Sequence, residues 1–316
     1  MSVSVIIVNF NSGKLLAKCL RHLAAQTVPP DQVFVVDNAS TDGSAEIEDS
    51  LDGVKVIKVA ENIGFAAGNN LALTRCNTSW VALLNPDAFP DPDWLKALLA
   101  ATRAHPEVAM FGSRLVLADN PKLLDGDGDC YHISGTVWRD GHGRQFTSET
   151  EPWEVFSPCA AAALYRTEAL RQVDGFDEDF FCYLEDVDLG FRIRLLGHRC
   201  LQVPMAVVHH MGSATSGGQR GDFATYYGHR NLVWTYFKNM PPALFWLFMP
   251  LHLMVNLLSL ILGFARGQRR VMFKAKRDAF CGLWPIWRKR RIIQRGKTAS
   301  TAKILKSLDK CVFRSL

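Results

Sequence analysis

The sequence lacks several features that define whole classes of protein. Its eight cysteines include no Cys-x-x-Cys pair, and no secretory signal precedes the first strand-like run. We therefore expect reduced cysteines that pack in the core of a cytosolic protein. The G-x-G-x-x-G fingerprint of dinucleotide-binding folds and the complete G-x-x-x-x-G-K-S/T P-loop are also missing. These absences argue against a disulfide-stabilised, dinucleotide-binding or P-loop protein.

Acidic residues are scarce in the carboxyl-terminal part of the chain. Residues 266–316 contain 16 Lys and Arg against 2 Asp and Glu, whereas residues 1–265 contain 20 against 29. With 316 residues and 48% hydrophobic content, the chain is long enough for one large globular domain or for one domain plus an appendage. The basic part could bind nucleic acid or an anionic membrane surface, and the apolar segment just before it favours the membrane.

Short β-branched runs alternate with helical patterns at the start of the chain. Strands are predicted at residues 3–10, 32–36, 54–59 and 80–84, with helices at about 15–23, at 45–51 and up to about residue 75. This alternation predicts an α/β fold with a parallel sheet and right-handed crossovers. The polar loops that follow these strands would share one sheet edge, which suits a nucleotide, although any single loop could be an ordinary turn.

The stretch VALLNPDAFPDPDW, residues 81–94, has the pattern of a buried strand that ends in a turn. Asp87 would stand where the sheet meets solvent. A carboxylate there could hold a divalent cation on a pyrophosphate, since Mg²⁺ prefers one or two carboxylates together with phosphates and water. The simpler alternative is that Asp87 only turns the chain and that Asp91 caps a helix beginning near Pro92.

The carboxylates Asp125, Asp127 and Asp129 have the spacing of a calcium loop. The glycine of its sixth position and the glutamate of its twelfth are missing, so we expect a flexible loop over the site instead.

Two adjacent pairs of residues carry possible site chemistry. Glu185 and Asp186 begin a helical pattern, where the helix dipole could stabilise them or one of them could serve as a general base. His209 and His210 follow a strand at 200–208 and could be core imidazoles or metal ligands.

Six motifs occur in an order typical of a known family. They are VSVIIVNFNS, VVDNASTDGS, ENIGFAAGNN, LLNPD, GFDEDFFCYLEDVDLGFR and VVHHMGSAT, across residues 3–215. In this order they resemble glycosyltransferase family 2, and more closely its bacterial rhamnosyltransferase-like branch. The resemblance implies the GT-A fold, a Rossmann-like, mostly parallel sheet flanked by helices, over residues 1–215. Its nucleotide-binding half would cover about 1–106 and its acceptor half about 107–215.

The resemblance also implies roles for individual residues. The nucleotide-sugar donor would be bound at the strand ends and in the loops after them by Asn9, Asp37, Asn38, Asn62, Gly64, Asn69, Asn85 and Asp87. Asp87 would hold Mg²⁺ or Mn²⁺ on the donor diphosphate, with His209 favoured over His210 as second ligand. Asp186, beside Glu185, would be the catalytic base for in-line attack with inversion. Where many relatives carry Asp-x-Asp, this chain has Asn85-Pro86-Asp87, so metal binding without nucleotide should be weak.

The region 216–316 is predicted to be helical, basic and membrane-associated. Residues 243–265 carry no formal charge and are long enough to cross a bilayer, with a buried core helix as the alternative. One span would put the basic tail on the far side, against the positive-inside bias. We therefore expect an in-plane or re-entrant segment that bends at Pro250. Residues 271–295 would lie on anionic lipid, and Arg230-Asn231 are expected to border the acceptor site.

The resemblance and the membrane-like segment together predict an inverting glycosyltransferase at the cytoplasmic face of the bacterial inner membrane. It would move L-rhamnose from dTDP-rhamnose onto a lipid-linked, polyprenyl-diphosphate sugar in cell-surface polysaccharide synthesis. UDP-hexose or galactofuranose donors are alternatives within this class. A catalytically silent nucleotide-sugar-binding scaffold on the membrane is an alternative of another class. Nucleic-acid binding is disfavoured because the basic tail follows a lipid-like segment.

Overall fold

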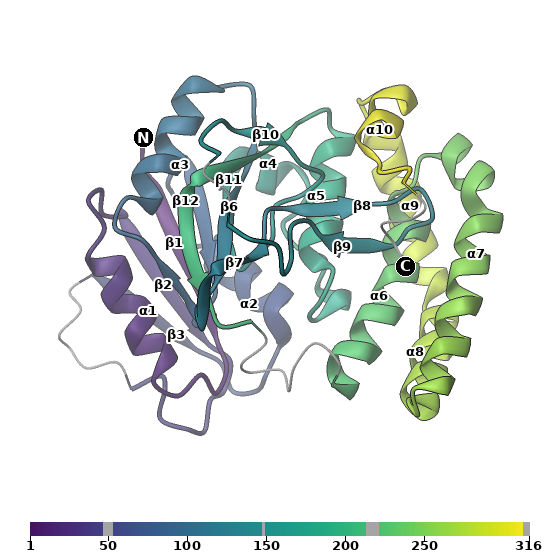
Figure 1. Ribbon diagram of the computed structural model, residues 1–316, viewed down its shortest axis with the longest axis horizontal. Coiled ribbons are helices and arrows are strands. Elements are labelled where there is room, and N and C mark those ends of the chain that lie inside the picture. Colours follow the sequence, from purple (N-terminus) through teal and green to yellow (C-terminus); the bar gives the residue numbers. More distant parts are fainter. Residues whose placement is uncertain (47–52, 147–148, 213–220, 312–316) are drawn as a thin grey trace.

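The computed structural model describes residues 1–46, 53–146, 149–212 and 221–311 (Figure 1). Its strands are β1 (Val3–Asn9), β2 (Gln32–Asp37), β3 (Val54–Lys58), β4 (Trp80–Leu84), β5 (Ala88–Pro90), β6 (Met110–Leu117), β7 (Asn120–Gly126), β8 (Asp129–Tyr131), β9 (Val137–Arg139), β10 (Trp153–Glu154), β11 (Ala162–Arg166) and β12 (Cys200–His210). Its helices are α1 (Leu15–Ala24), α2 (Gly64–Leu73), α3 (Trp94–Ala104), α4 (Thr167–Gln172), the 3-10 helix η1 (Glu178–Phe180), α5 (Glu185–Leu195), α6 (Asp222–Asn239), α7 (Pro242–Ala265), α8 (Arg269–Cys281), α9 (Leu283–Gly296) and α10 (Thr301–Ser307).

The main sheet runs in the order β10-β12-β6-β11-β4-β1-β2-β3, with β5 paired to β12 and β7 paired to β6. β1 is parallel to β2 and β4, and β2 is parallel to β3. In the other half β12 is parallel to β6, while β11 runs antiparallel between β6 and β4. The predicted α/β class is confirmed, with the parallel pairing concentrated in the amino-terminal half. The carboxyl ends of β1, β2, β4, β6 and β12 therefore meet at one edge.

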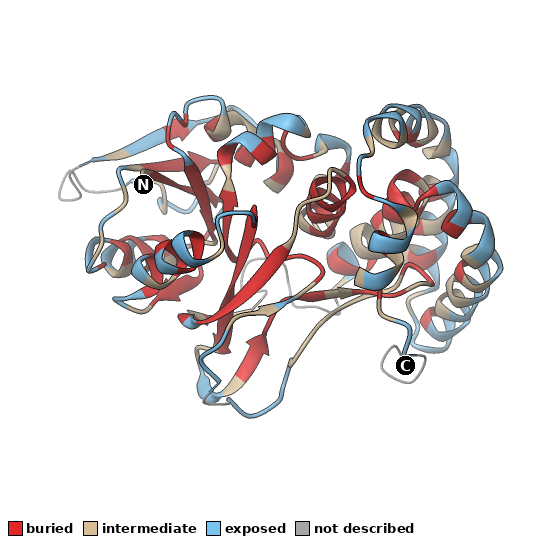
Figure 2. Ribbon diagram, turned by 90° about the horizontal axis from the view of Figure 1, so that it is seen from above, coloured by how far each residue is buried: buried red, intermediate tan, exposed pale blue. Residues whose placement is uncertain are grey.

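The two faces of the sheet carry separate cores. Successive residues of a strand point to opposite faces. Val5 and Ile7 accordingly pack into one apolar cluster with residues of α1 and α3, whereas Ile6 and Val8 join a second cluster with residues of α2 and α5. Burial on both faces explains the near-continuous apolar runs of these strands (Figure 2).

The four amino-terminal strands lie where the sequence predicts them, to within about one residue. The predicted helix at 45–51 falls largely on residues outside the described ranges. The prediction of a flexible loop around Asp125 is wrong, because β7 and β8 enclose this segment and Asp125, Asp127 and Asp129 are all buried. Asp125 and Asp129 belong to β7 and β8, and Asp127 lies in the bend between these strands. Asp125 pairs with the partly buried Arg139, and Asp127 pairs with the buried Arg114.

Helix α7 is exposed on one side of the molecule. It remains one continuous helix past Pro250, and only 11% of its most apolar 18-residue window is buried. Helix α7 is therefore not a buried core helix, which was the alternative expectation for this segment. Several large apolar side chains on it face solvent, namely Trp246, Leu247, Leu253, Met254, Leu257, Leu258, Ile261 and Leu262.

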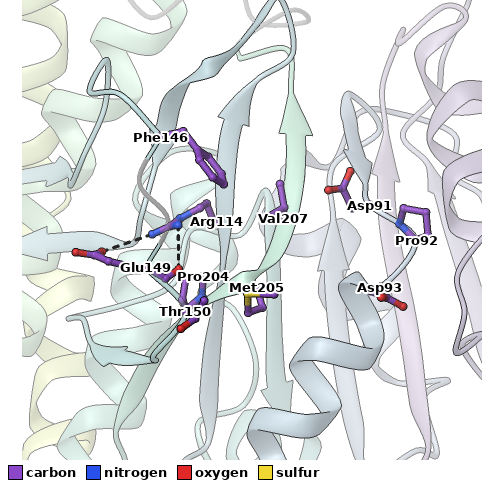
Figure 3. A pocket seen from close by; sticks show the side chains of 10 residues that line it. All are labelled: Asp91, Pro92, Asp93, Arg114, Phe146, Glu149, Thr150, Pro204, Met205 and Val207. Atoms are coloured by element: carbon purple, nitrogen blue, oxygen red, sulfur yellow. Dashed lines mark hydrogen bonds and ion pairs between the residues drawn. The ribbon is translucent and has the colours of Figure 1, made fainter.

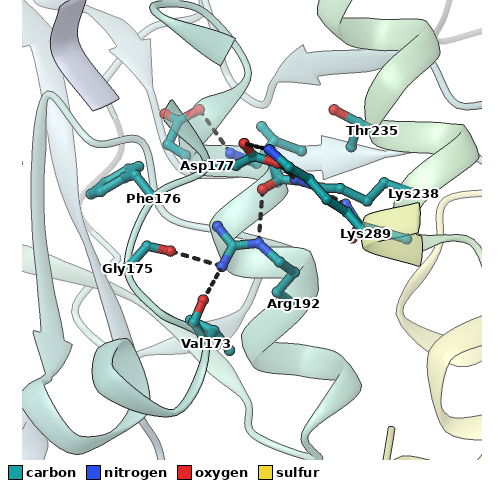
Figure 4. Close-up of polar contacts among 12 residues, drawn as sticks. Val173, Gly175, Phe176, Asp177, Arg192, Thr235, Lys238 and Lys289 are labelled. Atoms are coloured by element: carbon teal, nitrogen blue, oxygen red, sulfur yellow. Dashed lines mark hydrogen bonds and ion pairs between the residues drawn. The ribbon is translucent and has the colours of Figure 1, made fainter. Parts of the chain in front are cut away.

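A buried ionic network attaches the carboxyl-terminal helices to the body of the protein (Figure 4). Lys238 of α6 lies 2.5 Å from Asp177 and 2.7 Å from Asp188, and Lys289 of α9 lies 2.5 Å from Asp177. Arg192 of α5 binds Asp188 at 2.8 Å and also donates to the carbonyl of Val173. Helices α5, α6 and α9 are thus joined around the turn that precedes Glu185.

Candidate active site

The carboxyl ends of the parallel strands bring the predicted donor residues to one edge of the sheet. Asn9 and Asp37 are register partners at the ends of β1 and β2. Asp87 follows β4, and His210, at the end of β12, is paired in register with Ala88 of β5. Residues from four distant parts of the sequence therefore surround one region.

Asn9 and Asp37 form a buried polar pair. The Nδ2 of Asn9 donates to Oδ1 of Asp37 at 3.1 Å, and to the hydroxyls of Ser40 and Ser44 at 3.1 and 3.0 Å. A carboxylate and an amide fixed in this way can hydrogen-bond a base or a ribose at the sheet edge.

The amides of Asn38 and Asn62 shape the loop after β3. Asn38 donates to the carbonyl of Gly64 at 3.0 Å, and Asn62 accepts from the N–H of Gly64 at 2.9 Å. Asn69 bonds within its own helix, to the carbonyl of Phe65 at 2.9 Å. Gly64 has a φ of +87°, and a Cβ there would lie 2.5 Å from the ring of Phe181, so this position requires glycine.

The imidazole beside Asp87 is that of His210. Its Nε2 lies 3.3 Å from Oδ1 of Asp87, and its Nδ1 lies 2.8 Å from Oδ2 of Asp125. Burial opposes the charged form of His210, but the hydrogen bonds and charges of Asp125 and Asp87 outweigh it and raise its pKa to about 9. Burial also opposes the ionised form of Asp125, but His210 and Arg139 lower the pKa of Asp125 to about 2.

His209 points to a different partner. Its Nε2 lies 3.1 Å from Oδ1 of Asp91, so neighbouring histidines of one strand take opposite directions. Asp91 does not cap α3, which begins at Trp94. The structure thus brings His210, and not the favoured His209, to Asp87.

The side chains around Asp87 carry the kinds of atoms that bind a divalent cation. Asn85 Oδ1 is buried without a hydrogen-bond partner among the described residues, and such an atom needs a ligand, an ion or water to satisfy it. Within the described ranges, no three His, Cys, Asp or Glu side chains form a complete metal cage. A cation at Asp87 would therefore need most of its ligands from outside these side chains.

Arg139 links the group of Asp87, His210 and Asp125 to a second group of carboxylates. It donates to Asp125 at 2.6 Å and to the sulfur of Cys159 at 2.9 Å, and it interacts electrostatically with Asp129 and Asp186. The sequence pattern does not predict Asp125, Asp129 or Arg139 as residues of the active site. The available signal was that Asp125, Asp127 and Asp129 alternate in sequence, as residues on one face of a strand do. The arginines that pair with these carboxylates come from elsewhere in the chain.

Glu185 and Asp186 occupy different environments at the start of α5. Glu185 is buried, and its Oε2 has no hydrogen-bond partner in the part of the chain that the structure describes. Burial together with the charge of Asp186 raises the pKa of Glu185 well above the ordinary value. Asp186 is half-buried and accepts from the N–H of Ala160 at 3.0 Å. Burial and the charge of Asp186 also raise the pKa of Asp129, to about 8. Asp186 is therefore the member of this group that reaches solvent.

A separate cavity of about 430 Å³ lies away from these residues (Figure 3). Arg114 and Glu149 line it opposite Asp91, and none of the predicted donor or base residues does. The predicted donor and base residues therefore lie outside this cavity.

Comparison with known proteins identifies the family. The sequence model described as glycosyl transferase family 2 matches residues 4–174. An N-acetylglucosaminyl-diphospho-decaprenol L-rhamnosyltransferase of Mycobacterium tuberculosis is 29% identical over 243 residues, which cover 67% of this chain and 76% of that protein. A pre-mycofactocin glycosyltransferase of the same species is 31% identical, over 57% of this chain and 37% of that protein.

Solved structures share the fold at low sequence identity. S. aureus TarS 1–349 in complex with UDP-GlcNAc has a TM-score of 0.59 at 19% identity, over 97% of this chain and 89% of that one. The mannosyltransferase PcManGT from Pyrobaculum calidifontis, in complex with GDP-Man and Mn²⁺, has a TM-score of 0.55 at 20% identity, over 96% and 86%. The predicted GT-A-like fold is confirmed. With a family match over more than half of its length, this chain belongs to glycosyl transferase family 2.

Proposed function

We propose that this glycosyltransferase is an inverting, metal-assisted rhamnosyltransferase that moves L-rhamnose from dTDP-rhamnose onto a lipid-linked glycan. One juxtaposition carries the proposal: the Asp87–His210 pair is connected through Asp125 and Arg139 to the carboxylates at the start of α5. The name of the mycobacterial relative, which includes both L-rhamnose and a diphospho-decaprenol acceptor, supports this choice of donor and acceptor.

In this proposal Asp186 is the catalytic base. It takes the proton of the acceptor hydroxyl, whose oxygen attacks the anomeric carbon from the face opposite the nucleotide. The bond from that carbon to the diphosphate oxygen breaks, the configuration inverts, and dTDP leaves. The partial exposure of Asp186 and the hydrogen bond that it accepts from the N–H of Ala160 support this role, whereas burial raises the pKa of Glu185 well above its ordinary value and so favours its uncharged form.

Asp87 and His210 would hold Mg²⁺ or Mn²⁺, with Asn85 beside them. When bound, the cation stabilises the negative charge that develops on the leaving diphosphate. We assign the second metal ligand to His210 in place of His209, because His210 contacts Asp87 and is oriented by Asp125, as metal-binding histidines commonly are.

The nucleoside would be bound by Asn9 and Asp37 at the ends of β1 and β2. We assign Asn38, Asn62 and Gly64 to the loop that borders the donor, where their mutual hydrogen bonds support its shape. Asn69 would act through the same loop, since its amide is bonded within α2.

We further propose that α7 lies in the plane of the membrane, at the cytoplasmic face of the bacterial inner membrane. The middle of α7 is tied to the body: His252 Nδ1 lies 2.7 Å from the carbonyl of Ser134, and its ring stacks on Tyr236 at 3.9 Å. A helix that crossed the bilayer would have to break these contacts. Beside the exposed apolar face of α7, helices α8 and α9 expose the basic residues that suit anionic lipid, namely Arg269, Arg270, Lys274, Arg277, Arg288, Arg291 and Arg295.

The test offers the purified protein a panel of donors, comprising dTDP-rhamnose, UDP-hexoses and UDP-galactofuranose, with a lipid-linked GlcNAc acceptor and Mg²⁺ or Mn²⁺. We expect a rhamnosylated product of inverted configuration, identified by mass spectrometry and NMR. Transfer from a UDP-sugar but not from dTDP-rhamnose would contradict the assignment of dTDP-rhamnose as donor. Binding of nucleotide sugar without transfer from any donor would favour the scaffold alternative.

A further inference from the structure

The chain turns sharply just before the carboxylates of α5. Phe181, Tyr183 and Leu184 all have positive φ angles, of 64°, 66° and 65°. Phe181, with a ψ of −64°, is the centre of a γ-turn in which the N–H of Cys182 donates to the carbonyl of Phe180 at 2.7 Å. This form of γ-turn is rare and strained, and large side chains seldom adopt positive φ. Such a segment persists only where its surroundings hold it.

Asn231 of α6 supplies much of that support. It is fully buried, and its Nδ2 donates to the carbonyls of Phe180, Cys182 and Tyr183 at 3.0, 3.0 and 2.7 Å. An amide nitrogen has two N–H bonds, so three carbonyls of the turn share them. A side chain almost 50 residues away in sequence therefore fixes the backbone of this turn.

Arg230 completes the contact from the same helix. Its Nη2 donates to the carbonyls of Asp179 and Phe180 at 2.8 and 3.0 Å, and its Nε donates to Oδ1 of Asn231 at 2.8 Å. Arg230 therefore also orients the amide of Asn231.

The opposite side of the turn rests on the donor loop. The carbonyl of Phe181 accepts from the N–H groups of Phe65 and Ala66 at 2.8 and 3.2 Å, directly after Gly64. The ring of Phe181 stacks on Tyr227 of α6 at 5.2 Å. The turn is thus held between the start of α2 and one face of α6.

We propose that Asn231 and Arg230 are positioning residues that hold this strained turn and thereby set the place of Asp186. Leu184, the last residue of the turn, is the N-cap of α5, and Asp186 lies two residues after it. This inference rests on the proposed role of Asp186 as base. It assigns a function to the Arg-Asn pair that the sequence places only near the acceptor site.

The experiment is a double-mutant cycle between Asn231→Ala and Asp186→Asn. For Asn231→Ala we expect kcat to fall about 100-fold, because small displacements of a catalytic group cost about that much, while the Kd for the donor stays within about twofold. In the Asp186→Asn background, whose residual rate is measured with radiolabelled donor, Asn231→Ala should lower transfer by less than about threefold.

Gln294→Ala is the matched control, because this amide donates from α9 to the carbonyl of Asn239 at 2.8 Å and does not touch the turn. It should keep the wild-type kcat. If Asn231→Ala does not fold, Arg230→Lys replaces it, with an expected loss of about tenfold and the same dependence on Asp186.

Unchanged kcat in Asn231→Ala or Arg230→Lys would overturn the proposal. The proposal would also be overturned if the loss of transfer from either substitution multiplied with the loss from Asp186→Asn. Multiplying losses would show that Asn231 or Arg230 acts independently of the base. Full transfer by Asp186→Asn alone would instead remove the base role of Asp186, and this inference with it.

Discussion

The two ends of the site are built in different ways. The donor end uses residues at the carboxyl ends of parallel strands, where Asn9, Asp37 and Asp87 follow directly from the strand pattern. The base end uses a strained turn, held by α6 and the start of α2, and an arginine from β9. The residues proposed for the donor end can therefore be located from local strand patterns, whereas the residues proposed to support the base are recognised only once distant segments have packed together.

Among the variants outside the Glu185-Asp186 pair, the largest effects are expected at the residues proposed to bind the metal. Asp87→Asn should lower transfer about 1,000-fold, since it removes the carboxylate assigned to the cation on the diphosphate. His210→Gln should follow with a loss of about 100-fold, and the matched variant His209→Gln should stay within about twofold. Steady-state transfer rates, together with Mn²⁺ affinity in the presence of dTDP by electron paramagnetic resonance, measure both. An equal loss in the two histidine variants would remove the assignment of His210.

Substitutions at Asp125 and Asp127, which lie two residues apart, test the link between the two ends of the proposed site. Asp125 contacts His210 and Arg139, whereas Asp127 contacts Arg114 and Gln202. Asp125→Asn should weaken Mn²⁺ binding about 10- to 100-fold, because this carboxylate would orient the imidazole that we assign to the metal. Asp127→Asn is the control and should lower thermal stability without changing Mn²⁺ affinity. Equal Mn²⁺ affinity in both variants would contradict the link.

Much of the donor end could be predicted from sequence because strand ends carry their own signal. The fold class, the four amino-terminal strands and the edge that gathers Asn9, Asp37 and Asp87 follow from alternating apolar runs. The choice between His209 and His210 could not, because it depends on which face of β12 each side chain takes. The roles of Arg139 and Asn231 depend on contacts between distant elements, which a single sequence does not reveal.

Substitutions on the exposed face of α7 should weaken membrane binding without changing the transfer reaction. The paired substitution Leu253→Asp and Leu257→Asp places two charges on the exposed face of α7. We expect at least about tenfold weaker binding to anionic vesicles in a flotation assay, with transfer to a short-chain soluble acceptor unchanged. Met205→Asp, on a comparably exposed apolar residue of β12, should bind vesicles like the wild type. If the α7 variant floated with the vesicles as well as the wild type, α7 would not be the lipid contact.

The smallest effect concerns the ionic network behind the base. Burial works against the ionised carboxyl of Asp177, but Lys238 and Lys289 outweigh it and hold its pKa below the ordinary value. The unfolded chain therefore binds this proton more readily, so stability from Asp177 is present above about pH 4 and is lost as the pH falls further. Lys289→Met should lower the free energy of unfolding at pH 7 by about 1 kcal/mol, after allowance for the partial exposure of Lys289.

The same variant should show a flatter fall in stability between about pH 5 and pH 3, measured by thermal unfolding. Lys306→Met, exposed on α10, serves as control and should keep the wild-type pH dependence. A steeper acid loss in Lys289→Met would contradict the pairing of Lys289 with Asp177.

The contrast within the Glu185-Asp186 pair tests the central assignment most directly. Transfer rates and donor affinities of Asp186→Asn and Glu185→Gln should be measured side by side. The account predicts that Asp186→Asn loses about 1,000-fold or more in kcat with its donor Kd unchanged, because the half-exposed carboxylate is the base. It predicts that Glu185→Gln stays within about tenfold, because burial raises the pKa of Glu185 and already favours the uncharged form that glutamine mimics. Transfer that survives in Asp186→Asn and disappears in Glu185→Gln would contradict it.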